Sequence, residues 1–361
     1  MPDLVELREV QEQFTGPLMH WYASNKRELP WRQTSDPYLI WLSEIILQQT
    51  RIDQGMAYYH RFAEVFPDVT ALASAPQDQV MKLWQGLGYY SRARNLQSAA
   101  KMIVSDFNGV FPGDYSEIIK LPGVGPYTAS AVASIAFGKK HAVVDGNVYR
   151  LLSRWFGIST PIDTTPGQKE FAVLASGLIP ADRPGDFNQA MMDFGSMVCK
   201  PVNPLCNECP LAAGCHAFRE QNADSYPAKA GKTKVRNRYL LYLICKDNRG
   251  RTLIRLREGK DIWNGLYEFP VIEYDQIYSF ENFSKSPQFN KLHLGEEPIV
   301  EAVSKVRYHQ LSHRKLHLLF VHIRVSTLPT DGPFLIKKLS ELPNIAMPRA
   351  LTRYIEEIGL M

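Results

Sequence analysis

The sequence predicts two regions of different fold class, an all-helical region followed by a mixed α/β domain. A chain of 361 residues is longer than one packed core usually absorbs, so two domains are the default expectation. Apolar residues recur at helical spacing over residues 18–218, whereas strand-like runs separated by turn signals begin at residue 239. The pattern changes across a stretch at 224–237 that contains Pro and Gly, which we interpret as a linker.

Proline residues divide the helical region into separate helices. Asp36 precedes Pro37 and an apolar run that ends at Leu47, which is the pattern of an N-cap followed by proline at the first helical position. We therefore predict a helix over this run, within a helical region that spans residues 1–223. Further breaks fall before Pro67, Pro76, Pro112, Pro122 and Pro166.

The second domain is predicted to span residues 238–361. Strand-like runs cover 239–245 and 252–256, with a turn-like segment at 247–250 between them. A third strand is expected at 317–325, and a helix at 349–358. The sequence contains no internal repeat.

The charge of the chain is unevenly divided. The net charge of +4 is too small to identify a nucleic-acid-binding protein by itself. Residues 1–225 carry a net charge of −4, however, and residues 226–361 carry +8. The linker contributes to this basic excess and has no acid after Asp224; its cations, with the residue that closes it, are Lys229, Lys232, Lys234, Arg236 and Arg238.

The N-terminal residues 1–14 are polar and acid-rich, without the apolar core of a signal peptide, and no later stretch has the length of a membrane span. We expect a cytoplasmic protein with no membrane partner. Five cysteines, four of them crowded into 199–215, do not resemble a disulfide framework in a chain of this length.

Four cysteines form the strongest signal in the sequence. Cys199, Cys206, Cys209 and Cys215 are separated by six, two and five residues, so four thiolates in one short loop can enclose a soft metal centre. The spacing alone leaves zinc and an iron–sulfur cluster open, and it is compatible with a centre that only staples the loop. Cys245 lies far away in the sequence and is expected in the core.

A glycine-rich hairpin is the second signal. Residues 121–129 have the sequence LPGVGPYTA and precede a run of small residues. Two glycines let the backbone turn sharply and approach a phosphate, and the helix that follows offers N–H groups and a favourable dipole end. We interpret Leu121, Gly123, Val124 and Gly125 as a DNA-binding hairpin rather than an ordinary turn, holding DNA without reading its sequence.

Two carboxylates stand in unusual contexts. Glu44 interrupts an apolar helix, where burial would raise its pKa towards that of a usable general acid. Asp145 ends an apolar run and precedes a predicted helix that begins at Gly146. Each has an ordinary alternative, a glutamate at the edge of a buried face for the first and an N-cap for the second.

Taken together, these features resemble the endonuclease III superfamily of DNA glycosylases and, within it, the bacterial adenine glycosylase (MutY) family. The resemblance covers nearly the whole chain. The matching strings are SEIILQQT at 43–50, GLGYYSRARNL at 86–96, the hairpin, VDGNV at 144–148 and the cysteine loop.

The resemblance implies a six-helix barrel over about 21–135, and a cluster domain from 1–20 and about 136–223 that holds a [4Fe-4S] cluster. By similarity, Glu44 protonates an adenine flipped out of double-stranded DNA, and Asp145 stabilises the sugar cation. Tyr127 and Asn147 resemble supporting hydrogen-bonding residues of the active site. Three residues are expected at the DNA, of which the last two resemble wedges into the duplex: Gln48, Gln49 and Tyr89.

Tyr127 also separates subfamilies. Bifunctional relatives have a lysine at this hairpin position, which attacks the sugar and leads to strand cleavage, whereas a phenol cannot form a Schiff base. We predict base removal without efficient lyase activity.

The second domain resembles a Nudix-like (MutT-like) domain that recognises 8-oxoguanine, through WNGLYEFP at 263–270 and HQLSH at 309–313. The glutamate-rich metal box of Nudix hydrolases is missing, so pyrophosphate hydrolysis is not expected. Where the family usually has Phe, this chain has Leu311, beside Ser312 and His313. The last two residues can still supply hydrogen bonds to a damaged guanine, but the aromatic contact is lost.

The sequence therefore predicts a monomeric glycosylase that removes adenine opposite 8-oxoguanine or guanine. Three alternatives remain. A thymine glycosylase acting on T·G mismatches can also carry tyrosine at the hairpin, although such relatives typically lack the Nudix-like domain. A non-catalytic DNA-binding protein and a Nudix hydrolase with a helical arm are the other two.

Overall fold

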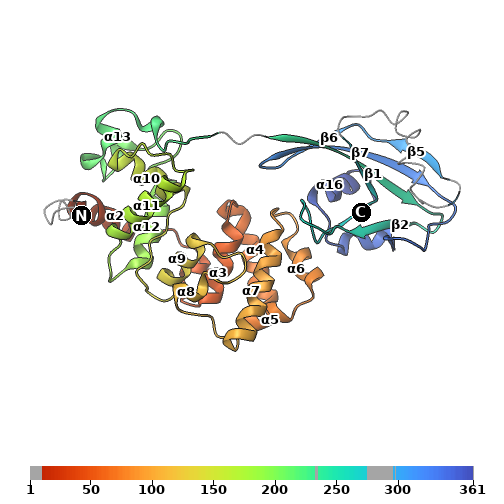
Figure 1. Cartoon of the computed structure of the whole chain (residues 1–361), viewed down its shortest axis with the longest axis horizontal. Helices are drawn as coiled ribbons and strands as arrows, with labels where there is room; N and C mark the ends of the chain where they lie inside the picture. The colour runs from red at the N-terminus through yellow and green to blue at the C-terminus, as the bar shows by residue number, and fades with distance from the viewer. Residues whose placement is uncertain (1–9, 232–234, 275–295, 297, 361) are drawn as a thin grey trace. The chain divides into compact units, whose positions relative to one another are not determined.

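The computed structural model describes residues 10–231, 235–274, 296 and 298–360. Two of the predicted linker cations, Lys232 and Lys234, and the first nine residues of the N-terminal segment lie outside the described residues. The predicted fold class is confirmed, because helices fill the first part of the chain and a mixed sheet with helices follows (Figure 1).

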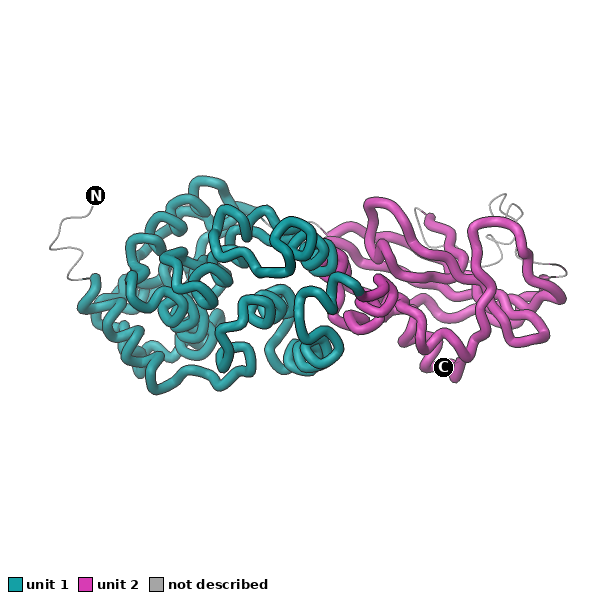
Figure 2. The backbone as a smooth tube through the Cα atoms, turned by 90° about the horizontal axis from the view of Figure 1, so that it is seen from below, with its two compact units in different colours: residues 1–74, 95–232 teal, residues 75–94, 233–361 magenta. Residues whose placement is uncertain are grey.

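By its contacts the chain forms two compact units, shown in two colours in Figure 2. Unit 1 comprises residues 1–74 and 95–232, and unit 2 comprises 75–94 and 233–361. Within unit 2, the side-chain amide of Gln85 donates to the carbonyl of Met347 at 3.1 Å, and the Lys82 ammonium donates to that of Ile345 at 3.5 Å. These bonds explain why residues 75–94, expected in the helical barrel, cluster with the sheet.

Unit 1 is all-helical. Helix α12 packs against α2, α9 and α10 around a core that includes Phe14, Leu152, Phe171 and Phe194. The α-helices, apart from the first residues of α7, which belong to unit 2, are α2 (Gly16–Asn25), α3 (Pro37–Leu47), α4 (Ile52–Val65), α5 (Val69–Ser74), α7 (Ser91–Phe107), α8 (Tyr115–Ile118), α9 (Pro126–Ile135), α10 (Gly146–Phe156), α11 (Thr165–Leu178), α12 (Pro184–Met197) and α13 (His216–Arg219). Short helical turns are η1 (Gln11–Thr15), η2 (Pro30–Arg32), η3 (Cys206–Glu208), η4 (Ala212–Gly214) and η5 (Ala223–Ser225).

Unit 2 is built on a mixed sheet. Strands β1 and β7 pair in parallel over their full length, from Arg236 opposite Arg314 to Lys246 opposite Arg324, and the other pairs are antiparallel. The path runs β3-β2-β1-β7-β5; β4 pairs with β1, β6 with β7 and β8 with β2. The elements are α6 (Gln77–Trp84), β1 (Arg236–Lys246), β2 (Arg251–Leu256), β3 (Tyr267–Glu268), β4 (Val271–Tyr274), β5 (Ile299–Val303), β6 (Arg307–Gln310), β7 (Arg314–Arg324), β8 (Leu335–Lys338), η6 (Leu339–Asn344) and α16 (Arg349–Glu357).

Ring stacking attaches α16 to this sheet. The ring of Tyr354 on α16 stacks on Phe320 of β7 with centroids 3.8 Å apart, and its hydroxyl lies 2.7 Å from the imidazole of His322. Strand β1 begins at Arg236, two residues inside the range expected as linker, because its parallel pairing with β7 starts there. Among the described helices, none is both long enough and apolar enough to cross a membrane.

Candidate active site

Glu44 lies inside unit 1 on helix α3, which begins as the sequence predicts. The carboxylate of Asp36 accepts a hydrogen bond from the amide of Tyr38 at 2.8 Å, and Pro37 occupies the first turn. Because α4 and α9 pack against α3, residues on several sides of this helix are buried. Glu44 is therefore only 8% exposed.

Burial changes the acidity of Glu44. It raises the pKa of this carboxyl from 4.5 to about 7, with a hydrogen bond from Tyr127 and the charge of Arg32 opposing the rise and the charge of Asp145 adding to it. In a substantial fraction of the molecules Glu44 therefore keeps its proton at neutral pH. This is the protonation state that a general acid requires.

Tyr127 is the second residue of α9. Its hydroxyl interacts with the Glu44 carboxyl and lies 3.3 Å from the sulfur of Met192, so its single proton is donated to one of these two groups at a time. Burial, with the charge of Glu44, holds the pKa of Tyr127 well above its ordinary value, so the phenol stays protonated. The side chain can hold the Glu44 carboxyl in place without competing for its proton.

Asp145 caps helix α10. One oxygen of its carboxylate accepts from the amides of Asn147 and Val148 at 2.9 and 2.8 Å, and the other accepts from the side-chain amide of Asn147 at 2.8 Å. Burial raises the pKa of Asp145, while these hydrogen bonds oppose the rise. The positive end of the α10 dipole further favours an anion here. The N-cap role and a charged site are therefore combined in one residue.

One cavity of about 170 Å³ brings the predicted catalytic residues together. Glu44, Tyr127, Asp145 and Asn147 all line it. A cavity of about 10–15 Å³ is enough for one water molecule, so a cavity of about 170 Å³ can admit a much larger group. Two carboxyl groups whose pKa values are both raised by burial thus line one cavity.

Two arginines in this cavity were missed by the sequence analysis. Arg27 and Arg32 line it and both bind Asp193, whose side chain is fully buried: Arg32 donates to its two oxygens at 2.6 and 3.0 Å, and Nε of Arg27 donates at 2.8 Å. Burial alone would raise the pKa of Asp193, but hydrogen bonds and charges from Arg32 and Arg27 hold it below its ordinary value. An acid within the apolar run around Met192 and Phe194 was the one available signal, because Asp193 is 161 residues from Arg32.

In the hairpin Gly123 is exposed, whereas Leu121 and Val124 are buried. Leu121 and Val124 are 2% and 8% exposed, and the amide of Val124 donates to the carbonyl of Leu121 at 3.1 Å. Gly123 has a φ of 76°, and a Cβ there would lie 2.6 Å from the Cβ of Asn95. Helix α9 starts directly after Gly125. Leu121 and Val124 therefore present little surface to DNA, and Gly123 is the exposed residue of the turn between them.

The two predicted wedge residues share an unusual backbone conformation. Gln49 in unit 1 has a φ of 55° and Tyr89 in unit 2 has a φ of 47°, and both side chains are exposed. Such positive φ values are uncommon outside glycine and often mark a functional constraint. Gln48 next to the first wedge donates through its side-chain amide to the hydroxyl of Thr128 at 3.1 Å.

In unit 2, Leu311, Ser312 and His313 form the loop between β6 and β7. The Ser312 hydroxyl is hydrogen-bonded to the hydroxyl of Tyr89. All four residues line one cavity of about 740 Å³ within this unit.

All four cysteines of the predicted metal loop line one hollow of about 30 Å³ in unit 1. Over the described parts of the chain, no three His, Cys, Asp or Glu side chains are arranged around a single metal ion. Nη1 of Arg154 lies 3.4 Å from the sulfur of Cys199. Arg150 connects this region to the active site, since it donates to the carbonyl of Cys199 at 2.7 Å and to the side-chain oxygen of Asn147 at 2.9 Å. Cys245 lies apart, in the core of unit 2.

We predict that Glu44→Gln stabilises the folded chain above neutral pH. A raised pKa means that the folded chain binds this proton more tightly than the unfolded chain, so the resulting stability is complete below pH 4.5 and lost as the pH rises through about 7. Glutamine stays neutral throughout. At about pH 8 the variant should gain up to about 3 kcal/mol in free energy of unfolding, and the gain should shrink towards about pH 5.

The measurement is the denaturation midpoint of both chains across this pH range. A gain that does not vary with pH would contradict the burial of an ionisable carboxyl at this position.

Comparisons with known proteins agree with this geometry. Residues 42–175 match the HhH-GPD superfamily of base excision DNA repair proteins, and residues 241–357 match a NUDIX domain. The adenine DNA glycosylase of Buchnera aphidicola subsp. Baizongia pistaciae is 31% identical over 352 residues, which covers 96% of each chain. Its counterpart from Buchnera aphidicola subsp. Schizaphis graminum is 33% identical over 87% of this chain and 88% of its own.

Solved structures match a part of the chain. A thermostable thymine-DNA glycosylase is 31% identical with a TM-score of 0.56, and covers 59% of this chain and 98% of its own. An endonuclease III trapped covalently on DNA, 24% identical with a TM-score of 0.52, covers 61% of this chain and 99% of its own and shows the fold. From the matches along almost its whole length, we conclude that the chain belongs to the adenine DNA glycosylase (MutY) family.

Proposed function

We propose that this chain is a base excision repair enzyme that hydrolyses the N-glycosidic bond of adenine paired with 8-oxoguanine or guanine in double-stranded DNA. The observation that carries the proposal is the cavity shared by Glu44 and Asp145. One carboxyl has a pKa of about 7 and the other is held by three hydrogen bonds that favour its anion.

The chemistry follows from these two states. Adenine is a poor leaving group until its ring is protonated, and the Glu44 carboxyl can supply that proton. As the bond to the base breaks, positive charge develops on the sugar, which the Asp145 carboxylate stabilises. Water then forms a bond to the sugar carbon and releases a proton, which replaces the one that Glu44 gave to the base, so the products are free adenine and an abasic site.

Tyr127 and Asn147 position the two acids. The phenol of Tyr127 binds Glu44, and the side-chain amide of Asn147 binds Asp145 at 2.8 Å. Tyr127 thus fixes the position of the Glu44 carboxyl, and Asn147 fixes that of Asp145, before a base enters the cavity. Because a stacked base hides its glycosidic bond, the adenine has to be flipped out of the duplex.

The surface features fit a role in holding and opening DNA. Backbone groups of the hairpin at 121–125 can approach a phosphate at the start of α9. Gln49 and Tyr89 are the proposed wedges, with Gln48 beside the first of them. Such wedges would fill the gap that the flipped adenine leaves in the base stack, and would thereby stop the base from returning to the duplex.

Leu311, Ser312 and His313 are the proposed readers of the base opposite the adenine. Their hydroxyl and imidazole can hydrogen-bond 8-oxoguanine, while Leu311 offers apolar contact without an aromatic face. The adenine DNA glycosylase relatives match both units, whereas the thymine-DNA glycosylase covers only 59% of this chain. This difference favours adenine over thymine as the excised base.

We further propose that Cys199, Cys206, Cys209 and Cys215 hold a [4Fe-4S] cluster. The four thiols line one hollow, and their spacing resembles that of the cluster loop in the endonuclease III superfamily. When bound, the cluster would staple the cysteine loop and take no part in bond breaking. We expect a monomer that acts in the cytoplasm, where a bacterial chromosome lies.

The proposed activity is tested with a panel of duplexes. We expect adenine release opposite 8-oxoguanine and, more slowly, opposite guanine, and none of thymine from T·G, as measured by strand scission after alkali. Glu44→Gln should abolish base loss, because it removes the proton donor, while duplex binding measured by gel shift is retained. Release of thymine but not adenine would replace the proposal with its main alternative.

A second test concerns the fate of the sugar. Because the Tyr127 phenol cannot form a Schiff base, borohydride should not trap the chain on its DNA product in stoichiometric amount. A bifunctional glycosylase with a hairpin lysine serves as the positive control on the same gel. Trapping as complete as in that control would mean that another amine of this chain attacks the sugar.

A third test concerns the metal. The purified chain should contain about four iron atoms per molecule and absorb visible light. Cys215→Ala should lose most of this iron, whereas the matched variant Cys245→Ala should keep it, because that thiol lies in the core of unit 2. Zinc in place of iron, or equal loss from both variants, would reject the proposed cluster.

A further inference from the structure

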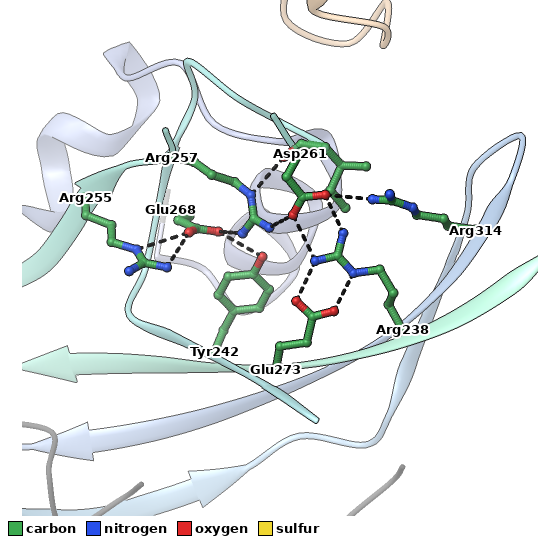
Figure 3. Close-up of polar contacts among 9 residues, drawn as sticks. Arg238, Tyr242, Arg255, Arg257, Asp261, Glu268, Glu273 and Arg314 are labelled. Carbon is green, nitrogen blue, oxygen red and sulfur yellow. Dashed lines mark hydrogen bonds and ion pairs between the residues drawn. The ribbon is translucent and has the colours of Figure 1, made fainter. Parts of the chain in front are cut away.

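A network of ion pairs lies beside the proposed reader loop in unit 2 (Figure 3). Glu268 is fully buried and accepts from Arg255, Arg257 and the hydroxyl of Tyr242. Glu273 is 47% exposed and, among the described residues, pairs with Arg238. Asp261 links these two acids, because it pairs both with Arg257, a partner of Glu268, and with Arg238, the partner of Glu273.

Asp261 binds three guanidinium groups at once. Arg238 on β1 donates to both of its oxygens, at 2.7 and 2.9 Å, and Arg257 donates at 2.5 Å. Arg314 donates at 2.7 Å. The pKa of Asp261 lies far below its ordinary value, because these hydrogen bonds outweigh the opposing effect of burial. Its charge is thus present at any pH at which the enzyme would work.

The third partner connects Asp261 to the reader loop. Arg314 is the first residue of β7 and directly follows His313. Its carbonyl accepts from the amide of Leu311 at 2.8 Å, which closes the loop, and the amide of Arg236 donates to the carbonyl of His313 at 3.0 Å. Both ends of the loop are therefore fixed to strands, and Arg314 is the side chain that extends this support to Asp261.

Asp261 itself belongs to a second loop, at 257–266. The amide of Arg257 donates to the carbonyl of Leu266, and the amide of Gly265 donates to that of Arg257, each at 2.8 Å. Inside this closed loop Trp263 is buried at a φ of 61°, a conformation that bulky side chains rarely adopt and that the surroundings must impose. The side chain of Arg257 contributes by donating to the carbonyl of Ile262 at 2.8 Å.

The two loops line the same 740 Å³ cavity as Tyr89. We infer that Asp261 is a positioning residue for the recognition of 8-oxoguanine: by binding Arg314 and Arg238 it holds the loop of Ser312 and His313 in register with the loop at 257–266. The inference rests on the proposed function of that loop. Asp261 does not contact the lesion, and its effect is transmitted through Arg314.

The charges explain why this contact matters more than an ordinary surface pair. An isolated exposed ion pair contributes little, because water competes for both partners. Asp261 binds three guanidinium groups. Two of them, those of Arg238 and Arg257, are only 15% and 10% exposed, so water competes little for them and Asp261 is the anion at the centre of a fixed network. Removing its charge leaves three guanidinium groups close together without the anion between them.

The experiment compares Asp261→Asn with the parent chain. The measured quantity is the ratio of the single-turnover rate of adenine release opposite 8-oxoguanine to that opposite guanine. We expect Asp261→Asn to lower the ratio on the order of tenfold, as for coupled residues in one network, with the rate opposite guanine changed by less than about twofold. A role confined to stability would lower both rates together.

Glu273→Gln is the matched control. It also removes a carboxylate from Arg238, but Glu273 has no contact with Arg314 among the described contacts of this network. Its ratio should stay within about twofold of the parent's. An equal drop in both variants would assign the effect to Arg238 or to general stability, and would overturn the inference.

Arg314→Gln provides a second route in case Asp261→Asn does not fold. It cuts the same connection while Asp261 keeps Arg238 and Arg257. It should lower the ratio as Asp261→Asn does, and the double variant should be no worse than either single one. Full discrimination by folded Arg314→Gln would overturn the inference.

The parent chain separates this inference from the proposed function. If the parent does not prefer 8-oxoguanine over guanine, the proposed reader role fails, and the positioning role fails with it. If the parent discriminates and both folded variants discriminate equally well, the positioning role alone is rejected.

Discussion

The burial of one carboxyl group beside another is the constraint on which the catalytic unit depends. Glu44 keeps its proton because α3 is covered on several sides, whereas Asp145 remains available as an anion because α10 begins at it and supplies two amide hydrogen bonds. In water the Glu44 carboxyl would be ionised at neutral pH, whereas at Asp145 the hydrogen bonds of the helix start oppose the rise in pKa that burial causes. The helices of unit 1 therefore determine the chemistry by deciding how much water and how many N–H groups each carboxyl meets.

The two carboxylates would repel each other when both are ionised, so the site also needs positive charge nearby. Arg27 and Arg32 supply positive charge, and the fully buried Asp193 fixes them. Such a buried pair is costly to break, because either partner alone would be an uncompensated charge. The same logic appears in unit 2, where Glu268 and Asp261 are each shared by more than one arginine. In both units, rigid side-chain positions are obtained from ion networks and not from apolar packing alone.

The sequence predicted those features whose signals are local. The N-cap at Asp36, the glycines of the hairpin, the cysteine spacing and the strand around Leu241 each involve neighbours within a few residues. The contacts that lie between distant residues could not be predicted in this way. Asp193 meets Arg32 across 161 positions, and Asp261 meets Arg314 across 53. The parallel pairing of β1 with β7 is equally non-local, and it moves the start of the sheet into the expected linker. Family resemblance, and not the context of either residue alone, suggested the catalytic roles that we propose for Glu44 and Asp145.

Leu311 gives the ion network of unit 2 a specific importance. An aromatic ring recognises a base through a broad face and tolerates small displacements, whereas a hydroxyl or an imidazole recognises it through directed hydrogen bonds. In the proposed reader loop the ring is absent, so under our proposal discrimination depends on Ser312 and His313, whose hydrogen bonds would weaken steeply as distance and angle depart from the ideal. A loop that depends on such bonds must be held within a fraction of an ångström. Strands β6 and β7 fix its ends, and Asp261, through Arg314, adds the support that the backbone alone does not give.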